Sequence, residues 1–292
     1  MELLHLHIGD AHLALAPDLG GAIAALSVAG KPVLRSWSGT PDDGPFAMAS
    51  NVLVPFSNRV SDGGFTFRGV RYDLPANLYS EPFPIHGDGF QRAWPPEFHQ
   101  DGTVRLVLRD GAIGPYIYRA EQIFELSDGG LSVRLKVENT GAHALPFGCG
   151  FHPWFPRTQD TRLSFECDGF WHEDVDHMPT NHVSLANAPD YDFSTMRALP
   201  AGWINNAFTQ WQGAARISQG PQDQSVTLTA DPVLSTAIIF SPGQDAAFFC
   251  FEPVSHPVDA HNQANQPGLR PLAPGDTLEA GFTLTWSEND TD

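Results

Sequence analysis

Basic residues are scarce in this sequence. Lysine and arginine number 16 against 34 aspartates and glutamates, which gives a formal net charge of -18 over 292 residues. Such a charge repels the phosphate backbone of nucleic acids and anionic membrane surfaces alike. We therefore expect neither a nucleic acid nor a membrane among the partners. The same excess argues against a phosphorylated substrate, although a well-placed pair of arginines could overcome a global charge.

Cysteine is also rare, and the N-terminus lacks the features of a targeting segment. The three cysteines, Cys149, Cys167 and Cys250, are far apart and form no CxxC pair, which favours reduced thiols over a disulfide framework or a zinc site. The opening MELLHLHIGDAHLALAPDLGG has no basic flank leading into a long apolar run, as a secretory signal or a membrane span would require. A cytoplasmic location is the expectation.

Nucleotide-binding and serine-hydrolase motifs are missing as well. The sequence contains no P-loop, no dinucleotide-type GxGxxG and no GxSxG. We therefore expect no nucleotide cofactor and no serine nucleophile.

Helical periodicity with caps at both ends is absent, whereas turn-forming residues are abundant. The chain has 27 glycines and 25 prolines spread along its length, a distribution typical of many short strands joined by tight turns. Apolar residues alternate with polar ones over 131–138 after the turn Ser-Asp-Gly-Gly at 127–130, and again over 278–286. This period of two predicts strands with one wet face. Without repeats or linkers, the pattern predicts an all-β protein, one domain over residues 1–292, built as a large antiparallel β-sandwich.

One apolar run differs from the alternating segments. Residues 246–251, AAFFCF, are continuously apolar, which predicts a strand covered on both faces and ending at Glu252. A carboxylate at a strand end is as often a plain surface charge as a functional group. Held in a partly dry cleft, Glu252 would have a raised pKa and serve as a general base.

A histidine lies among aromatics in FGCGFHPWFP, residues 147–156. His152 could be a core residue satisfied by one hydrogen bond, a metal ligand or an acid/base group. Pro153 is expected to end any regular strand there, so that a turn presents the imidazole at a cavity edge.

Two further motifs contain candidate ligand-binding residues. His86 precedes Gly87-Asp88-Gly89, a glycine-flanked loop that a ligand could approach, or a plain turn. Asn58 and Arg59 precede a predicted hairpin, and Arg59 could donate hydrogen bonds to sugar hydroxyls or be a surface charge.

The sequence contains two clusters of potential metal ligands. Neither matches a known ligand spacing, and polar loops of an acidic protein gather such groups by chance, so no metal site is expected. The clusters are His256, Asp259 and His261, and His172, Asp176, His177 and His182.

Four segments in this order, NRV…GGFTFRGVRYDLP, IHGDGFQRAW, GCGFHPWF and FCFEP, resemble the aldose 1-epimerase (galactose mutarotase) family. The resemblance runs from LAPDLGGAIAALSVAG near the start to PLAPGDTLEAGFTLTW near the end. It implies a galactose mutarotase-like supersandwich that needs no metal or nucleotide and interconverts the α and β anomers of a free monosaccharide.

The resemblance also implies roles for individual residues. His152 matches the general acid of the family, Glu252 the general base, and His86 the second histidine of the sugar site. Arg59, with its neighbour Asn58, falls in the sugar-binding segment. Two departures concern further substrate-binding positions: Asn205, in INNAF, stands where the family often has aspartate, and Trp154 where tyrosine is common.

The sequence therefore predicts a mutarotase, with three alternatives left open. A glycoside hydrolase would pair Glu252 with a second carboxylate, Asp88 or Asp259. A non-catalytic carbohydrate-binding protein would not need both His152 and Glu252. An epimerase acting on a phosphorylated or acidic sugar would need a charge-assisted site. Exposed sheet edges permit either a monomer or a homodimer.

Overall fold

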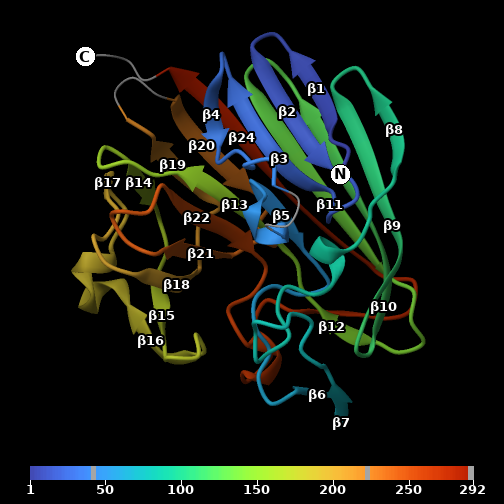
Figure 1. Ribbon diagram of the computed structural model, residues 1–292. Helices are drawn as coiled ribbons and strands as arrows, with labels where there is room; N and C mark the ends of the chain where they lie inside the picture. Colours follow the sequence, from blue (N-terminus) through green and yellow to red (C-terminus); the bar gives the residue numbers. More distant parts are fainter. Residues whose placement is uncertain (41–43, 221–223, 289–292) are drawn as a thin grey trace.

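The computed structural model describes residues 1–40, 44–220 and 224–288 and is nearly all β, as predicted (Figure 1). Each strand pair registered in these ranges is antiparallel. The helices described are single 3-10 turns: η2 (Pro45–Ala47), η3 (Gly89–Gln91), η4 (Leu185–Asn187), η5 (Pro189–Tyr191) and η6 (Ala260–Asn262). No helix in these ranges is long and apolar enough to span a bilayer.

The first sheet has 11 strands within the described residues, with β4 attached to β3 beside the main path. Its spatial order is β1 (Leu4–Ile8), β2 (Ala11–Ala16), β3 (Ala22–Val28), β5 (Ser50–Leu53), β13 (Gly150–Pro156), β22 (Phe248–Val254), β21 (Thr236–Ser241), β18 (Ile204–Thr209), β15 (Gly169–Glu173) and β16 (Pro179–Ser184), with β4 (Lys31–Leu34).

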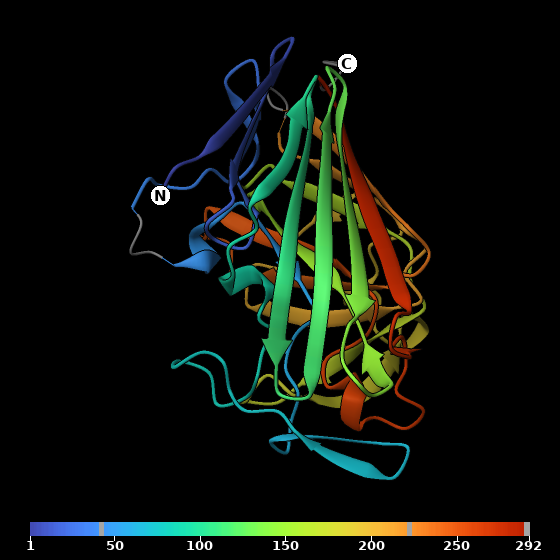
Figure 2. The same ribbon diagram turned by 90° about the vertical axis from the view of Figure 1, so that its right-hand side faces the viewer.

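The second sheet has nine strands, and Figure 2 faces its long strands. Its order is β17 (Arg197–Ala198), β14 (Arg162–Phe165), β19 (Ala214–Ser218), β20 (Gln224–Ala230), β24 (Thr277–Glu288), β11 (Gly130–Asn139), β10 (Tyr116–Leu126), β9 (Thr103–Ile113) and β8 (Pro96–Gln100). Two small ribbons complete the fold: β12 (Leu145–Phe147) with β23 (Arg270–Leu272), and β6 (Gly64–Phe67) with β7 (Val70–Asp73).

The predicted hairpin is confirmed. Strands β10 and β11 pair along their length, and the turn between them closes where the Ser127 N–H donates to the Gly130 carbonyl at 2.8 Å. The last alternating segment is β24, which lies between β20 and β11. Alternation turns the apolar side chains of these strands inward, which gives the second sheet its packing face.

Aromatic side chains join the two sheets in the core. Phe151 of β13 packs on Phe282 of β24, with ring centroids 4.8 Å apart. Phe251 of β22 meets Phe165 of β14 at 5.3 Å and Trp211 also at 5.3 Å. Residues one position along β13 and β22 must then face away from the core, because side chains alternate along a strand.

Two predictions about strand ends are wrong. Pro153 does not end a strand, since β13 continues through it to Pro156, and Glu252 lies inside β22, which continues to Val254. Pro153 is tolerated because it stays in register with Ser50 of β5, while the ladder to β22 has no pair between Gly150 and Trp154. The missing N–H of proline therefore coincides with a gap in the ladder.

We predict that Phe251→Ala destabilises the protein by about 3–5 kcal/mol, because the Phe251 side chain is fully buried between the sheets and its loss leaves a cavity. The free energy of unfolding from urea titration is the measurement. Ile117→Ala on β10 is the control: that side chain is 46% exposed, and its loss should cost under about 1 kcal/mol. Equal losses in the two variants would contradict this assignment of the core.

Candidate active site

A cavity of ≈ 330 Å³ opens on the face of the first sheet that is turned away from the second sheet. Its walls come from β13, β18, β21 and β22 and from the segments around residues 46, 58 and 86. All seven site residues predicted from the sequence line it. The lining residues are Phe46, Asn58, Arg59, Glu81, Ile85, His86, His152, Trp154, His177, Trp203, Asn205, Phe240 and Glu252.

His152 and Glu252 form a cross-strand pair on this face. The β13–β22 register pairs Gly150 with Val254 and Trp154 with Cys250, which sets His152 opposite Glu252. His152 Nε2 lies 3.3 Å from Glu252 Oε1. The two residues are only 6% and 2% exposed, so the pair is largely shielded from solvent.

Each member of the pair is followed by a proline. Pro153 and Pro253 both lack a backbone N–H, and none of the residues between Gly150 and Trp154 has a registered ladder partner on β22. The sheet thus lacks two donors where the pair lies. Neighbouring strands, β5 and β21, keep their register with His152 and Glu252 and hold both in place.

An aromatic stack orients the imidazole of His152. The indole of Trp154 lies parallel to it, with ring centroids 5.0 Å apart and an interplanar angle of 10°. The guanidinium carbon of Arg35 lies 3.8 Å from the centroid of the indole, and Arg35 also donates to the carbonyls of Phe46 and Met48. Arg35, which the sequence did not reveal, therefore fixes Trp154 and the turn that carries Phe46.

His86 reaches the cavity from a strained loop. It has a φ of 61°, and the next residue, Gly87, has a φ of 69°, where an added Cβ would lie 2.0 Å from the Val54 carbonyl oxygen. The Asn58 N–H donates to His86 Nδ1 at 3.0 Å, which leaves the proton of the neutral ring on Nε2. The His86 ring meets that of His152 edge-on, with centroids 5.5 Å apart.

Asn77 braces this loop and was not found from the sequence. Its amide donates to the carbonyls of Ile85 and Gly87 at 2.9 and 2.7 Å, and its oxygen accepts from the Ile85 N–H at 2.8 Å. No local pattern marks an asparagine for such a role, because its partners lie eight to ten residues away in a folded loop. Asn77 thereby holds His86 at the cavity.

Arg59 is bound to a carboxylate of the cavity wall. Its Nε donates to Glu81 Oε2 at 2.9 Å and its Nη2 to Glu81 Oε1 at 3.1 Å, a bidentate pair. The Asn58 oxygen accepts from the Arg59 backbone N–H at 2.9 Å. Arg59 therefore presents N–H groups to the cavity with its charge balanced by Glu81.

Aromatic residues form the remaining walls. Trp154 and Trp203 line the cavity together with Phe46 and Phe240. Asn205 of β18 also lines the cavity, and its Nδ2 donates to Glu173 Oε2 at 2.6 Å. An uncharged, partly apolar ring molecule with several hydroxyls fits such a lining.

Burial shifts the pKa values of His152 and Glu252 in opposite directions. It raises the pKa of Glu252 from 4.5 to about 8, an effect that the charge of Arg59 partly offsets. It lowers the pKa of His152 to about 3, with a smaller contribution from Arg35 in the same direction. Burial and the neighbouring His152 also lower the pKa of His86 well below its ordinary value. At neutral pH the pair therefore keeps one proton, on Glu252.

Two polar atoms of the pair have no hydrogen-bond partner among the residues that the structure describes. They are His152 Nδ1 and Glu252 Oε2, both buried. Most buried polar atoms in proteins make a hydrogen bond, so a buried atom without one calls for an explanation, such as a catalytic role or a bound water or ion. A bound molecule with hydroxyl groups could satisfy both.

The sequence model of the aldose 1-epimerase family matches residues 2–285 of this chain. The chain belongs to the aldose 1-epimerase family. An uncharacterized Escherichia coli K12 protein, YphB, is 34% identical over 279 residues, covering 92% of this chain and 94% of its own. The predicted membership is thus confirmed.

Solved structures agree with this assignment to the aldose 1-epimerases. A crystal structure of a candidate aldose 1-epimerase from Escherichia coli K12 superposes with a TM-score of 0.92 at 31% identity, covering 98% of this chain and 99% of that one. A galactose mutarotase-like protein from Clostridium acetobutylicum gives 0.86 at 20% identity, covering 98% and 95%. The second likeness concerns the fold alone, which is the predicted supersandwich.

The histidine clusters considered as metal ligands have other partners in this structure. His256 Nε2 accepts from the Ser57 N–H at 3.0 Å, and His261 Nε2 lies 2.9 Å from the Tyr116 hydroxyl. His177 Nδ1 lies 3.0 Å from Glu173 and His182 Nε2 lies 2.7 Å from the Thr209 hydroxyl. These imidazoles are therefore engaged in structural hydrogen bonds.

Within the described part of the chain, one group of three potential ligand atoms lies within 4.8 Å, on His152, Cys250 and Glu252. Burial, followed by the charge of Glu252, raises the pKa of the Cys250 thiol well above its ordinary value. A cation bound there would have to displace the protons of both the thiol and the Glu252 carboxyl group.

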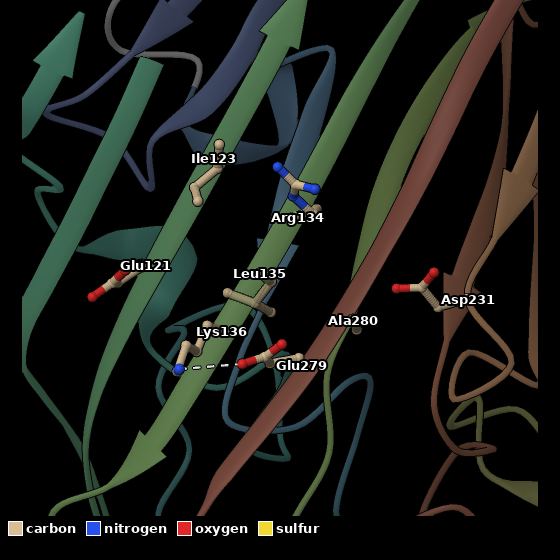
Figure 3. A pocket seen from close by; sticks show the side chains of 8 residues that line it. All are labelled: Glu121, Ile123, Arg134, Leu135, Lys136, Asp231, Glu279 and Ala280. Carbon is tan, nitrogen blue, oxygen red and sulfur yellow. Dashed lines mark ion pairs between the residues drawn. The ribbon is translucent and has the colours of Figure 1, made fainter. Parts of the chain in front are cut away.

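Another hollow, of ≈ 200 Å³, lies on the second sheet of the aldose 1-epimerase fold (Figure 3). Charged side chains surround it, and Lys136 pairs with Glu279 at 3.2 Å. Both side chains are about half exposed or more, at 49% and 67%, and no histidine lines the hollow. It lacks the shielded acid/base groups of the first cavity.

We predict that the carboxyl group of Glu252 is protonated at neutral pH and ionises at about pH 8, because burial raises its pKa. Infrared difference spectra between the wild type and Glu252→Gln follow the carbonyl stretch of the protonated acid, which should fade as the pH rises through that value. Ionisation near 4.5, the ordinary value, would contradict the shielding of the pair.

Proposed function

We propose that the protein interconverts the α and β anomers of a free aldose. The observation that carries this proposal is the buried pair of His152 and Glu252, which lie 3.3 Å apart on adjacent strands. Membership of the aldose 1-epimerase family supports the reaction class.

The geometry of the pair suits the chemistry of a hemiacetal. Ring opening moves a proton off the C1 hydroxyl and delivers one to the ring oxygen while the bond between C1 and the ring oxygen breaks. Both oxygens are attached to C1, so the accepting and donating groups must lie within a few ångströms of each other. A donor and an acceptor 3.3 Å apart can reach both oxygens of one sugar.

Glu252 is assigned as the base that takes the hydroxyl proton, and His152 as the acid that protonates the ring oxygen. For these roles the proton of the pair must pass from Glu252 to His152, a transfer across the 3.3 Å contact. Hydroxyls that donate to the unpartnered Glu252 Oε2 would stabilise its ionised form. The pair accepts one proton and donates one in each step, and on reclosure the roles reverse, so each group regains its starting protonation state.

Other cavity residues would hold the sugar. The His86 Nε2–H would donate to the ring oxygen or a neighbouring hydroxyl, and Arg59 and Asn58 would bind hydroxyls further along the ring. Trp154 offers an apolar face to the sugar. Because Arg59 is already paired with Glu81, the cavity carries no free positive charge toward a phosphate. The arrangement favours an uncharged aldose over a phosphorylated or acidic one.

The geometry gives less support to the other candidate functions. The Asp88 carboxylate accepts from Tyr118, Arg92 and the Ala112 N–H, and neither Asp88 nor Asp259 lines the cavity. Neither is placed across a scissile bond from Glu252, as a glycoside hydrolase requires. A carbohydrate-binding protein could use the unpartnered atoms for hydrogen bonds to hydroxyls, but it would not need a proton donor and a proton acceptor 3.3 Å apart.

We predict that Glu252→Gln and His152→Asn each slow anomer exchange by about 10²–10⁴-fold, because each removes one proton-transfer group while keeping the side-chain shape. Exchange is measured by NMR on galactose, glucose, arabinose and xylose. The matched controls are Glu279→Gln and His99→Asn, which alter exposed side chains of the second sheet and should exchange sugars at the wild-type rate.

Two outcomes would contradict the proposal. Sugar binding by the wild type without faster exchange would favour a binding protein. Release of nitrophenol from a nitrophenyl glycoside would favour a hydrolase. Unfolding curves in urea establish that each variant is folded before its rate is interpreted.

A further inference from the structure

A second cross-strand pair, Glu173 and Asn205, lies on the cavity face. Across the sheet it falls in the same row as Trp154, which is two residues after His152 on β13. The β15–β18 register pairs Gly169 with Thr209 and Trp171 with Ala207, which sets Glu173, the last residue of β15, opposite Asn205. Asn205 in turn is registered with Phe240 of β21. Glu173 therefore lies behind the cavity wall that Asn205 and Phe240 form.

Three side chains converge on the carboxylate of Glu173. Asn205 Nδ2 donates to its Oε2 at 2.6 Å, and Trp203 Nε1 donates to its Oε1 at 2.7 Å. His177 Nδ1 lies 3.0 Å from Oε2. The three partners all line the cavity, whereas Glu173 does not.

These contacts fix which way the amide of Asn205 points. An ionised carboxylate only accepts hydrogen bonds, so the NH₂ group must face Glu173 and the carbonyl oxygen must turn away from it. No protein donor to that oxygen is found among the described residues. Asn205 thus offers the cavity a neutral acceptor with a set orientation, which suits a hydroxyl group that donates.

Glu173 also anchors the outer wall of the cavity. Trp203 is 50% exposed, and besides Glu173 it contacts His177, stacked with centroids 5.5 Å apart, and Phe240 at 5.1 Å. An exposed indole loses conformational freedom when held, so it needs a strong contact to stay in place. A charge-assisted hydrogen bond from the indole N–H provides that contact.

We propose that Glu173 is a specificity-determining positioning residue, which orients Asn205 and Trp203 so that the cavity selects an uncharged aldose with a donating hydroxyl at this end. The inference rests on the proposed function and adds to it the residue that sets sugar preference. A carboxylate directly behind Asn205 also repels an anionic group on the sugar, such as that of a uronic acid.

The test uses Glu173→Gln. A glutamine side chain has one acceptor oxygen and a donor group, so it cannot accept from all three partners. We expect KM for galactose to rise about tenfold, the effect of losing a charge-assisted hydrogen bond, with kcat within about twofold of the wild type. Asn205→Ala should raise KM similarly, and the double variant should add little, because the two residues act through one contact. Glu279→Gln is the control for the same chemical change.

KM values for monodeoxy galactoses distinguish a positioning role from a structural one, because a merely structural role would affect all of these sugars equally. For the one sugar that lacks the hydroxyl facing Asn205, Glu173→Gln should leave KM unchanged, while the penalty persists for the others. Galacturonate, added as an inhibitor, should bind more tightly to Glu173→Gln than to the wild type. An equal penalty for every deoxy sugar, or a fall in kcat at constant KM, would overturn the proposal.

Measurements on the wild type distinguish a failure of this inference from a failure of the proposed function. If it fails to speed anomer exchange, the proposed function is wrong, and calorimetric binding of the same sugars to the wild type and Glu173→Gln still tests Glu173. If it exchanges anomers and Glu173→Gln matches it for all sugars, the inference about Glu173 alone is wrong.

Discussion

The register between β13 and β22 is the constraint on which the site depends. It sets His152 opposite Glu252, and the alternation of side chains sends Phe151 and Phe251 into the core between the sheets. A slip of one residue would exchange the two faces and put the acid/base pair in the core. The aromatic packing of the sandwich therefore fixes the position of the catalytic candidates as firmly as it stabilises the fold. This explains how two charged residue types come to lie side by side in a largely dry place.

Desolvation then sets the chemistry of the pair. Burial disfavours the charged form of both groups, so that one proton is shared where two exposed groups would ionise independently. The surrounding contacts keep the pair accessible to a ligand yet rigid: Arg35 supports Trp154 against His152, and Asn77 holds the loop that carries His86. A preorganised donor and acceptor need little reorganisation when a hemiacetal arrives, which is the main requirement for speeding a reaction that also runs slowly in water.

Much of the fold could be predicted from the sequence, because alternation over 131–138 and 278–286 is a local signal that burial enforces. The seven candidate site residues were predicted from motifs and from the family resemblance, and all of them line one cavity. Local rules failed at Pro153 and Glu252, since a gap in the ladder tolerates proline and a strand accepts a buried carboxylate where the opposite strand offers a partner. Glu173, like Arg35 and Asn77, could not be predicted from the sequence, because its hydrogen-bond partners come from segments that only the folded chain brings together.

The most direct test of the account is the pH dependence of kcat/KM for anomer exchange, corrected for the uncatalysed reaction. A pair that works with one proton should lose activity as the pH rises through about 8, where Glu252 gives up that proton in the free enzyme. The midpoint should match the infrared titration of the Glu252 carboxyl group. A rate that stays constant or rises through this range would contradict the claim that the buried His152–Glu252 pair shares the proton used in catalysis.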